Sequence, residues 1–313
     1  MVRTNMNEYR QLTKEELVSI NPALEKCGIH DHLSVSRFVD SKLDKIYNVY
    51  FLDYGEKTIL KKTTPAEKDM AVYSRYFDGH HFAVPKILSS FSVGEDHFIQ
   101  MEFADGADAR GCSEAEGKRI GKALADIQSY YLTTGGRTEK SEVYFEKQVE
   151  KHIESIKPYY SEYSAVFDFV EQRFFEAPQT LIHDDFLPIN VLLNDDNIWI
   201  IDWDFADILP YFVELGRFAF IYDMDNRFFI SKESAESFLK SYYHQMKKNP
   251  EFCVSEEEFR QDIAISVFCQ YALFVAQSLN TTDTKPSDQI PESIDNNYLK
   301  KIMQYIRTEC VHS

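Results

Sequence analysis

The sequence predicts an α+β fold in two lobes, with an antiparallel sheet in the N-terminal lobe and mainly helices in the C-terminal lobe. Short apolar runs separated by polar turns follow one another between residues 33 and 101, as in an antiparallel meander. From Ser113 onward, apolar residues recur at helical spacing, as Ile120, Leu124 and Ile127 do. The boundaries that these patterns predict are residues 1–101 for the first lobe, 102–106 for a hinge and 107–313 for the second lobe.

The composition limits the class of protein. The chain has 313 residues, of which 44% are hydrophobic, so it can bury the cores of two lobes. Its net charge of −17 argues against binding to nucleic acid or to anionic membranes, and it favours a cationic small molecule as partner. The five cysteines are scattered, without a CxxC pair, and the N-terminus has no apolar signal-peptide region. We therefore expect a cytoplasmic protein with reduced thiols and no cysteine metal site.

The elements predicted for the N-terminal lobe follow from capping signals and strand-like runs. Residues 1–30 are predicted to be helical, because Thr13 and Glu16 have the spacing of a capping box. A second helix is predicted from Pro65 to Tyr73, with the proline in its first turn. The runs that predict strands lie at residues 33–39, 46–52 and 58–61, with two more between residues 89 and 101.

The C-terminal part is predicted to consist of helices and one short hairpin. Besides the helix that begins at Ser113, helical patterns lie at residues 143–156, 162–175, 232–247, 255–279 and 298–308. Val191–Leu193 and Ile198–Ile201 predict the hairpin, and another helix is expected to begin at Pro210. The uncharged stretch Ile263–Thr282 is long enough to span a bilayer, but polar residues interrupt it, so we interpret it as a buried core helix.

The hairpin carries the residues with the clearest chemical pattern. Asn190 precedes its first strand and Asp202 follows its second, so the hairpin places an amide oxygen beside a carboxylate. Hard oxygen ligands of this kind suit Mg²⁺, which takes one or two protein oxygens together with phosphate oxygens and water. Asp185 lies five residues before Asn190, where it can accept a proton from an attacking hydroxyl group. The pattern predicts phosphoryl transfer, with Asp185 as the base and Asn190 and Asp202 on the metal.

The motif HxDxxxxN at residues 183–190, followed by Ile201-Asp202, resembles the catalytic core of the aminoglycoside phosphotransferase family. That family groups with choline kinases and other small-molecule kinases, which are distant relatives of the protein kinases. The resemblance covers about residues 33–225. It implies a protein-kinase-like fold and transfer of the γ-phosphoryl group of ATP, or of GTP, to a hydroxyl group of a small acceptor. It also implies that His183 holds the loop and is neither acid nor base.

The same resemblance assigns the residues that would hold the phosphates. Lys61 follows the apolar pair of the third predicted strand and is preferred to Lys62 as the residue that binds the α- and β-phosphates. Strand alternation puts Lys61 on the same face as Ile59. Glu67 is expected to pair with Lys61, and Asp69 is the rival partner. The turn between the first two predicted strands contains no glycine. Its Lys42 and Lys45 are either phosphate contacts or solvated turn charges.

The resemblance also bears on the nucleotide base and on substrate size. Backbone groups of Glu102, Phe103 and Ala104 are expected to hydrogen-bond the edge of the adenine. The segment Trp203–Val213 that follows the metal aspartate has only eleven residues, and the next predicted helix already begins within it at Pro210, which leaves no room for a peptide-substrate platform. Glu214 is expected to support the catalytic loop.

The sequence is compatible with more than one class of acceptor. The acidic charge and the segment at residues 67–70, which resembles aminoglycoside 3′-phosphotransferases, favour a cationic acceptor of the aminoglycoside type. A second reading is a kinase for choline, ethanolamine or another metabolite, and a third is a catalytically silent nucleotide-binding protein. Asp184 either contacts substrate or faces solvent. Asp204 and Asp207 are expected near the metal, where Asp207 binds a cationic acceptor or each is a solvated loop acid. We expect a monomer or a homodimer.

Overall fold

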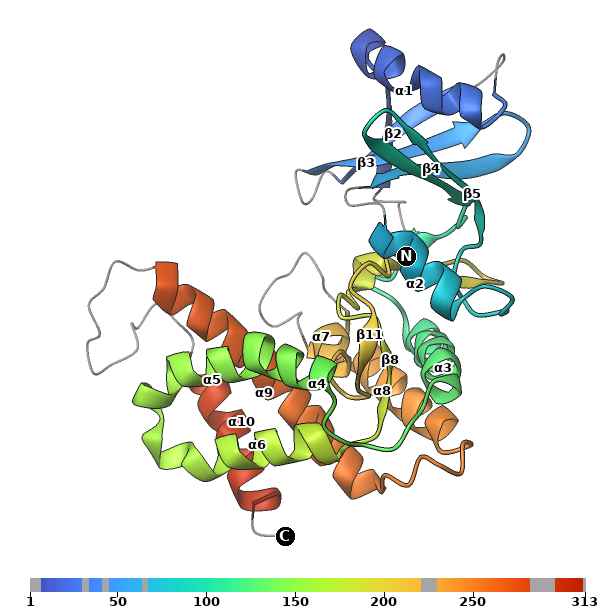
Figure 1. Ribbon diagram of the computed structural model, residues 1–313. Coiled ribbons are helices and arrows are strands. Elements are labelled where there is room, and N and C mark those ends of the chain that lie inside the picture. Colours follow the sequence, from blue (N-terminus) through green and yellow to red (C-terminus); the bar gives the residue numbers. More distant parts are fainter. Residues whose placement is uncertain are drawn as a thin grey trace. The chain divides into compact units, whose positions relative to one another are not determined.

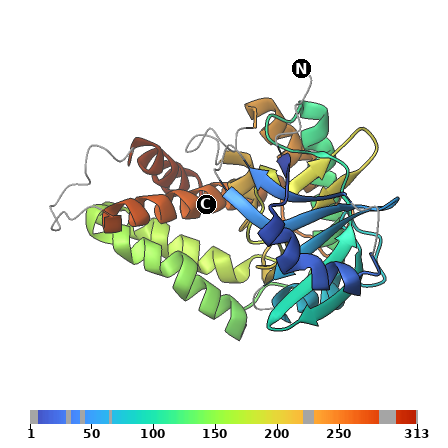
Figure 2. The ribbon, with the colours of Figure 1, turned by 90° about the horizontal axis from the view of Figure 1, so that it is seen from above.

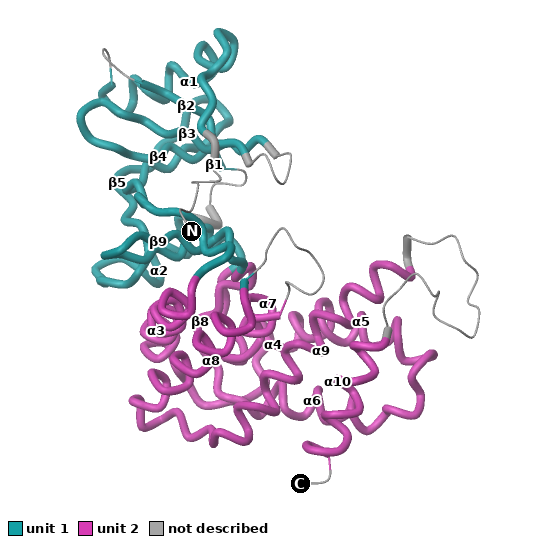
Figure 3. Tube along the Cα trace, turned by 180° about the vertical axis from the view of Figure 1, so that it is seen from behind, with its two compact units in different colours: residues 1–112, 187–205, 226–230 teal, residues 113–186, 206–225, 231–313 magenta. Residues whose placement is uncertain are grey.

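The computed structural model describes residues 7–29, 34–40, 45–63, 67–220, 230–281 and 296–311. The chain forms two compact units, which are described separately below (Figure 3). Unit 1 comprises residues 1–112, 187–205 and 226–230, and unit 2 comprises residues 113–186, 206–225 and 231–313. This division differs from the predicted lobes, because residues 107–112 and 187–205 were predicted in the C-terminal lobe and belong to unit 1.

The described part of unit 1 is built on a six-stranded sheet in the order β1-β2-β3-β4-β6-β5 (Figure 1). All of its neighbouring strands are antiparallel, as the sequence predicted. The strands are β1 (Asn7–Gln11), β2 (Ser34–Asp40), β3 (Lys45–Asp53), β4 (Lys57–Thr63), β5 (Ile87–Val93) and β6 (Asp96–Glu102). Two helices accompany them, α1 (Lys14–Lys26) and α2 (Glu67–Tyr76).

The two faces of this sheet have different roles. On one face Ile20 and Leu24 of α1 pack against Leu52, Leu60 and Phe98, and all five are almost completely buried. Because side chains alternate along a strand, the residues between these ones point to the other face. That second face forms a wall of the cavity described in the next subsection. The capping box of Thr13 and Glu16 begins α1, as predicted.

Strand β1 corrects the prediction that residues 1–30 are helical throughout. Its residues pair with β2 in register from Asn7 opposite Asp40 to Gln11 opposite Ser36. A short segment can be a strand where a neighbouring strand supplies its hydrogen-bond partners. Residues 1–6 lie outside the described part of the chain.

A second, small sheet in unit 1 has the order β10-β9-β7. It consists of β7 (Ala107–Asp108), β9 (Val191–Leu193) and β10 (Ile198–Ile200), with the 3₁₀ turn η4 (Pro188–Asn190) directly before β9. β9 and β10 form the predicted hairpin, and Asn194 caps its turn by accepting from the backbone N–H groups of Asp196 and Asn197. Pairing of β9 with β7 and the bond from Ile200 N to Ala83 O (2.6 Å) tie the hairpin to unit 1.

Unit 2 is mainly helical, as predicted (Figure 1). Its α-helices are α3 (Glu114–Tyr130), α4 (Glu139–Tyr144), α5 (Lys151–Ile156), α6 (Ser164–Glu176), α7 (Leu215–Phe220), α8 (Lys232–Met246), α9 (Glu256–Thr281) and α10 (Asn296–Glu309). The π-helical turn η1 (Phe145–Glu150) joins α4 to α5, and the 3₁₀ turns η2 (Lys157–Tyr159) and η3 (Ser161–Tyr163) join α5 to α6. Strand β8 (Gln179–Ile182) pairs with β11 (Asp207–Pro210). The helix predicted from Pro210 is therefore wrong at its start, because Pro210 ends a strand and the helix begins at Leu215.

Close packing of glycines joins α3 to α8. A Cβ atom on Gly117 would lie 2.4 Å from the Ser234 carbonyl oxygen, and one on Gly121 would lie 2.2 Å from the Phe238 carbonyl oxygen. Only glycine allows the backbones of the two helices to approach so closely. The rings of Phe186, Phe218 and Phe238 cluster beside this contact.

Helix α9 packs against α5, α7 and α10 (Figure 2). Among the described residues, Glu256–Leu279 is the one segment long and apolar enough to cross a membrane, with a mean hydropathy of 1.4. Within this segment, 56% of an apolar run of 18 residues is buried, and Phe268 and Ala272 have almost no exposed surface. This packing agrees with the interpretation as a core helix.

Candidate active site

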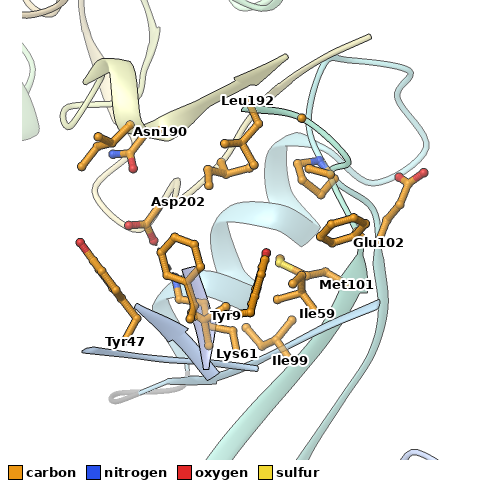
Figure 4. A pocket seen from close by; sticks show the side chains of 18 of the residues that line it. Tyr9, Tyr47, Ile59, Lys61, Ile99, Met101, Glu102, Asn190, Leu192 and Asp202 are labelled. Carbon is orange, nitrogen blue, oxygen red and sulfur yellow. Dashed lines mark hydrogen bonds and ion pairs between the residues drawn. The ribbon is translucent and has the colours of Figure 1, made fainter. Parts of the chain in front are cut away.

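A cavity within unit 1 is lined by the sheet, the small hairpin and the segment after β6 (Figure 4). Ile59 and Lys61 of β4 both point into it, as strand alternation predicted. Ile99 and Met101 of β6 line the apolar part of the cavity. The cavity therefore has an apolar end and a charged end around Lys61.

Lys61 forms the centre of the charged end. Its Nζ lies 2.7 Å from Asp202 Oδ1 and 3.1 Å from Asp204 Oδ2. Burial disfavours the charged ammonium, but the two carboxylates outweigh burial and raise the pKa of Lys61 above its ordinary value. Lys61 is therefore a fixed positive charge at the place where the prediction puts the phosphates. Glu67 opens α2, but its side chain and that of Asp69 lie outside the described part of the structure, so their pairing with Lys61 stays a prediction.

The hairpin brings Asn190 and Asp202 to the same cavity (Figure 4). β9 pairs with β10, and the Ile201 N–H donates to the Asn190 carbonyl oxygen at 2.9 Å, so the two residues flank one end of the ladder. Asp202 has a φ of 67°, in the left-handed region that aspartate tolerates better than most residues. This backbone conformation sets the direction of its carboxylate.

The donors fit a magnesium ion that is bound together with phosphate. An amide oxygen and one or two carboxylates are hard ligands, and Mg²⁺ usually adds substrate oxygens and water to such a set. In the part of the chain that the structure describes, no group of three or more His, Cys, Asp or Glu side chains could hold a metal ion. Asn190, Asp202 and Asp204 would hold the ion together with oxygens of a bound phosphate chain. The sequence placed Asp204 near the metal without assigning it a role.

Trp203 anchors the segment between these two carboxylates. Its ring is completely buried, lies 4.8 Å from the ring of Phe77, and donates through Nε1 to the Ile200 carbonyl oxygen at 2.9 Å. The side chains of Asp202 and Asp204 stay partly exposed, at 43% and 29%. A rigid aromatic anchor thus fixes the backbone while both carboxylates remain accessible.

The predicted hinge residues Glu102, Phe103 and Ala104 line the same cavity. Two of their backbone groups already have partners, because Glu102 N donates to Lys86 O at 2.9 Å and Ala104 O accepts from Gly106 N at 3.0 Å. The predicted hydrogen bonds to the edge of the adenine would therefore come from the other backbone groups of Glu102, Phe103 and Ala104.

The loop that carries Asp185 belongs to unit 2, where a buried network holds it. Glu214 accepts hydrogen bonds from His183 N at 2.6 Å, from Asp184 N at 3.1 Å and from Gln128 Nε2 at 2.6 Å. The completely buried His183 ring accepts from Asp185 N at 3.2 Å. These contacts agree with the predicted supporting roles of Glu214 and His183.

Arg217 is the residue beside Asp185 that the sequence analysis missed. Its guanidinium lies 3.0 Å from Asp185 Oδ1 and donates to the Asp184 carbonyl oxygen at 2.8 Å. The Arg217 side chain is 29% exposed and that of Asp185 is 27% exposed. The pair is separated by 32 positions in the sequence, so no local motif indicates it.

Two further acids of unit 2 also have partners. Asp184 has a φ of 62° and accepts from the Tyr144 hydroxyl at 2.7 Å. Burial raises the pKa of Asp184 to about 6, against the opposing effects of Tyr144 and Arg217. Asp207 pairs with Lys140 at 2.7 Å. Of the acids proposed as acceptor contacts, Asp207 is thus already neutralised by a lysine.

Comparison with known proteins places these features in context. Residues 45–247 match the family model described as the phosphotransferase enzyme family. No curated protein matches the sequence.

Solved structures share the fold at low sequence identity. A choline/ethanolamine kinase family protein from Mesorhizobium loti is 12% identical, with 95% of this chain and 96% of that chain covered and a TM-score of 0.57. An amicoumacin kinase in complex with AMP-PNP, Ca²⁺ and Ami is 13% identical, with 95% and 97% covered and a TM-score of 0.54. An aminoglycoside phosphotransferase, APH(4)-Ia, is 16% identical, with 95% and 99% covered and a TM-score of 0.51. These similarities support the predicted kinase-like fold.

Proposed function

The chain belongs to the phosphotransferase enzyme family, and we propose that it transfers the γ-phosphoryl group of ATP, or of GTP, to a hydroxyl group of a small acceptor. The observation that carries this proposal is the charged end of the cavity in unit 1. Lys61 lies 2.7 Å from Asp202 and 3.1 Å from Asp204, with Asn190 on the same cavity. One cation for phosphate and oxygen ligands for a metal are the groups that phosphoryl transfer needs.

Each residue has a defined part in the proposed reaction. Lys61 binds phosphate oxygens as a point charge, and Asn190 and Asp202 hold Mg²⁺. The ion supplies charge neutralisation of the phosphates. Asp185 orients the acceptor hydroxyl and accepts its proton as the new O–P bond forms and the bond to the leaving diphosphate breaks. Arg217 holds the carboxylate of Asp185 in position.

We propose a cationic acceptor of the aminoglycoside type. The net charge of −17 supports this class, because an acidic protein attracts polycations. Two proteins of similar fold are an amicoumacin kinase and an aminoglycoside phosphotransferase, which supports antibiotics as the first acceptors to try. The similarity to a choline/ethanolamine kinase family protein makes small amino alcohols the second class.

The test is a turnover assay with Mg-ATP and Mg-GTP on the purified protein. The acceptor panel holds kanamycin, gentamicin, hygromycin B, choline and ethanolamine. Asp185→Asn should lower turnover by about 10²–10⁴-fold, the usual contribution of a general base, while Mg-ATP still raises the melting temperature. Asp168→Asn, which changes an exposed acid on α6, is the matched control and should keep full activity. Turnover that survives in Asp185→Asn would exclude Asp185 as the base. Absence of Mg-ATP and Mg-GTP binding by the unmodified protein would exclude the proposed function altogether.

A further inference from the structure

Strand β1 adds an aromatic side chain to the cavity of unit 1. Tyr9 lies in the middle of β1 and is one of the residues that line the cavity, together with Lys61 and Asp202 (Figure 4). The sequence pattern predicts a helical segment over residues 1–30 and indicates no role for Tyr9. The strand therefore brings a residue from the N-terminal end of the chain to the predicted nucleotide site.

Ion pairs fix which way Tyr9 points. Arg10, the next residue of β1, forms two short hydrogen bonds with Glu16 of α1, at 2.7 and 2.6 Å. Arg37 of β2 binds the same carboxylate at 2.6 Å. Arg10 and Arg37 are partners in the strand register, so one carboxylate holds both strands to α1. Since neighbouring residues of a strand point to opposite faces, this clamp turns Tyr9 to the cavity face.

Other aromatic rings hold the Tyr9 ring in place. Its centroid lies 5.7 Å from that of Phe38 and 5.2 Å from that of Phe51. Phe51 in turn lies 4.9 Å from Phe103, in the predicted hinge, and Phe38 lies 5.2 Å from Tyr47. Tyr9, Phe38, Tyr47 and Phe103 all line the cavity, and we call them the aromatic wall.

The Tyr9 ring is nevertheless not sealed in the core. The residue is 36% exposed, so part of its surface is open to a ligand. Burial, with a contribution from Asp105, raises the pKa of Tyr9 to about 12, and its hydroxyl group therefore stays protonated in neutral solution. A neutral phenol offers an apolar ring face and a hydrogen-bond donor, the combination that suits the base and sugar of a nucleotide.

We infer that Tyr9 is a nucleotide-binding residue of the proposed phosphotransferase, whose ring packs against the nucleoside half of the bound triphosphate. The inference rests on the proposed function, because it needs a nucleotide in this cavity. Lys61 lies at the charged end, so the phosphates point away from the apolar part of the wall. Stacking on an aromatic ring uses the face of the base and is tolerant of its identity. Tyr9 therefore contributes affinity for both ATP and GTP.

The test compares two probes on the same proteins by calorimetry. Mg-ATP reports the whole site, and magnesium tripolyphosphate reports the phosphate end alone. Tyr9→Ala should weaken Mg-ATP binding about tenfold, which corresponds to about 1.4 kcal/mol, and should leave tripolyphosphate binding unchanged. Tyr9→Phe should bind Mg-ATP within about twofold of the unmodified protein, because the ring is kept. Tyr130→Ala is the control, since Tyr130 is 61% exposed and belongs to unit 2.

Tyr9→Leu keeps a large apolar side chain in β1, so it tests the role of the Tyr9 ring even where the alanine variant does not fold. Tyr9→Leu should also weaken the binding of Mg-ATP while leaving the binding of tripolyphosphate unchanged. In the turnover assay it should raise KM for ATP with little change in kcat. Equal Mg-ATP affinity in Tyr9→Ala and the unmodified protein would overturn the inference. An equal loss of tripolyphosphate and Mg-ATP binding would also overturn it, because Tyr9 would then only support the sheet. If the unmodified protein binds tripolyphosphate but no nucleotide, both this inference and the proposed function fail, whereas a failure of Tyr9 alone leaves the proposed function intact.

Discussion

Replacing Glu214 by glutamine should remove a pH dependence from the stability of unit 2. Glu214 is 1% exposed and accepts hydrogen bonds from His183 N, Asp184 N and Gln128 Nε2 at 2.6, 3.1 and 2.6 Å. The Tyr242 hydroxyl donates to Gln128, which extends the network. Burial raises the pKa of Glu214 from 4.5 to about 8, although the two backbone donors favour the ionised form. Glutamine keeps the shape of the side chain and cannot ionise.

The sign of the effect follows from proton binding. Between pH 4.5 and about 8 the folded protein keeps a proton on Glu214 that the unfolded chain has released. This contribution to stability is fully present below pH 4.5 and is lost as the pH rises through about 8. Linkage gives a loss of about 2 kcal/mol between pH ~6 and ~8 from this group alone. Asp184, whose pKa is raised to about 6, loses its own contribution in the same direction at lower pH.

The measurement is denaturant unfolding at pH 6, 7 and 8, followed by far-ultraviolet circular dichroism. Helices of unit 2 dominate this signal, whereas both tryptophans, Trp199 and Trp203, belong to unit 1. The free energy of unfolding of the unmodified protein minus that of Glu214→Gln should fall by about 2 kcal/mol across this range, and histidine titration cancels in the difference. Glu139→Gln, at an exposed position of α4, should show a constant difference. A constant difference for Glu214→Gln as well would refute the argument, because Glu214 would then be ionised in the folded protein.

Two further predictions concern unit 2. Arg217→Ala should lower kcat about tenfold without changing nucleotide affinity, because Asp185 loses its contact at 3.0 Å, and Arg217→Lys should restore part of the rate in steady-state assays. An unchanged kcat in Arg217→Ala would show that Asp185 needs no such support. Gly121→Ala should reduce the free energy of unfolding by about 1–3 kcal/mol in denaturant titrations, because its Cβ would lie 2.2 Å from the Phe238 carbonyl oxygen. An unchanged free energy of unfolding in Gly121→Ala would mean that α3 and α8 can move apart without loss of stability.

Local patterns predicted the parts of the protein that local interactions determine. The capping box at Thr13 is present because it needs only a hydroxyl and a glutamate three residues apart. The hairpin that carries Asn190 and Asp202 is present because apolar strands flank a polar turn. Lys61 lies on the same face of β4 as Ile59, as strand alternation predicted.

The features that the sequence did not predict depend on distant partners. Strand β1 exists through its pairing with β2 and the clamp at Glu16, which local propensity does not reveal. Pro210 was predicted to begin a helix, yet it ends a strand opposite Gln179, where the missing N–H is tolerated. Arg217 has no motif of its own, since only the tertiary fold brings it to Asp185.

The place of β1 at the border of its sheet has a practical consequence for handling the protein. Edge strands present unpaired backbone groups that can pair with strands of other molecules. An edge strand that is short and carries charged residues limits this self-association. β1 has 5 residues and includes Arg10, whereas its neighbouring strand β2 has 7 residues. A truncation that removes the residues before Leu12 would make β2 the edge strand of the sheet. Shortening the N-terminus would therefore favour aggregation as well as deleting Tyr9.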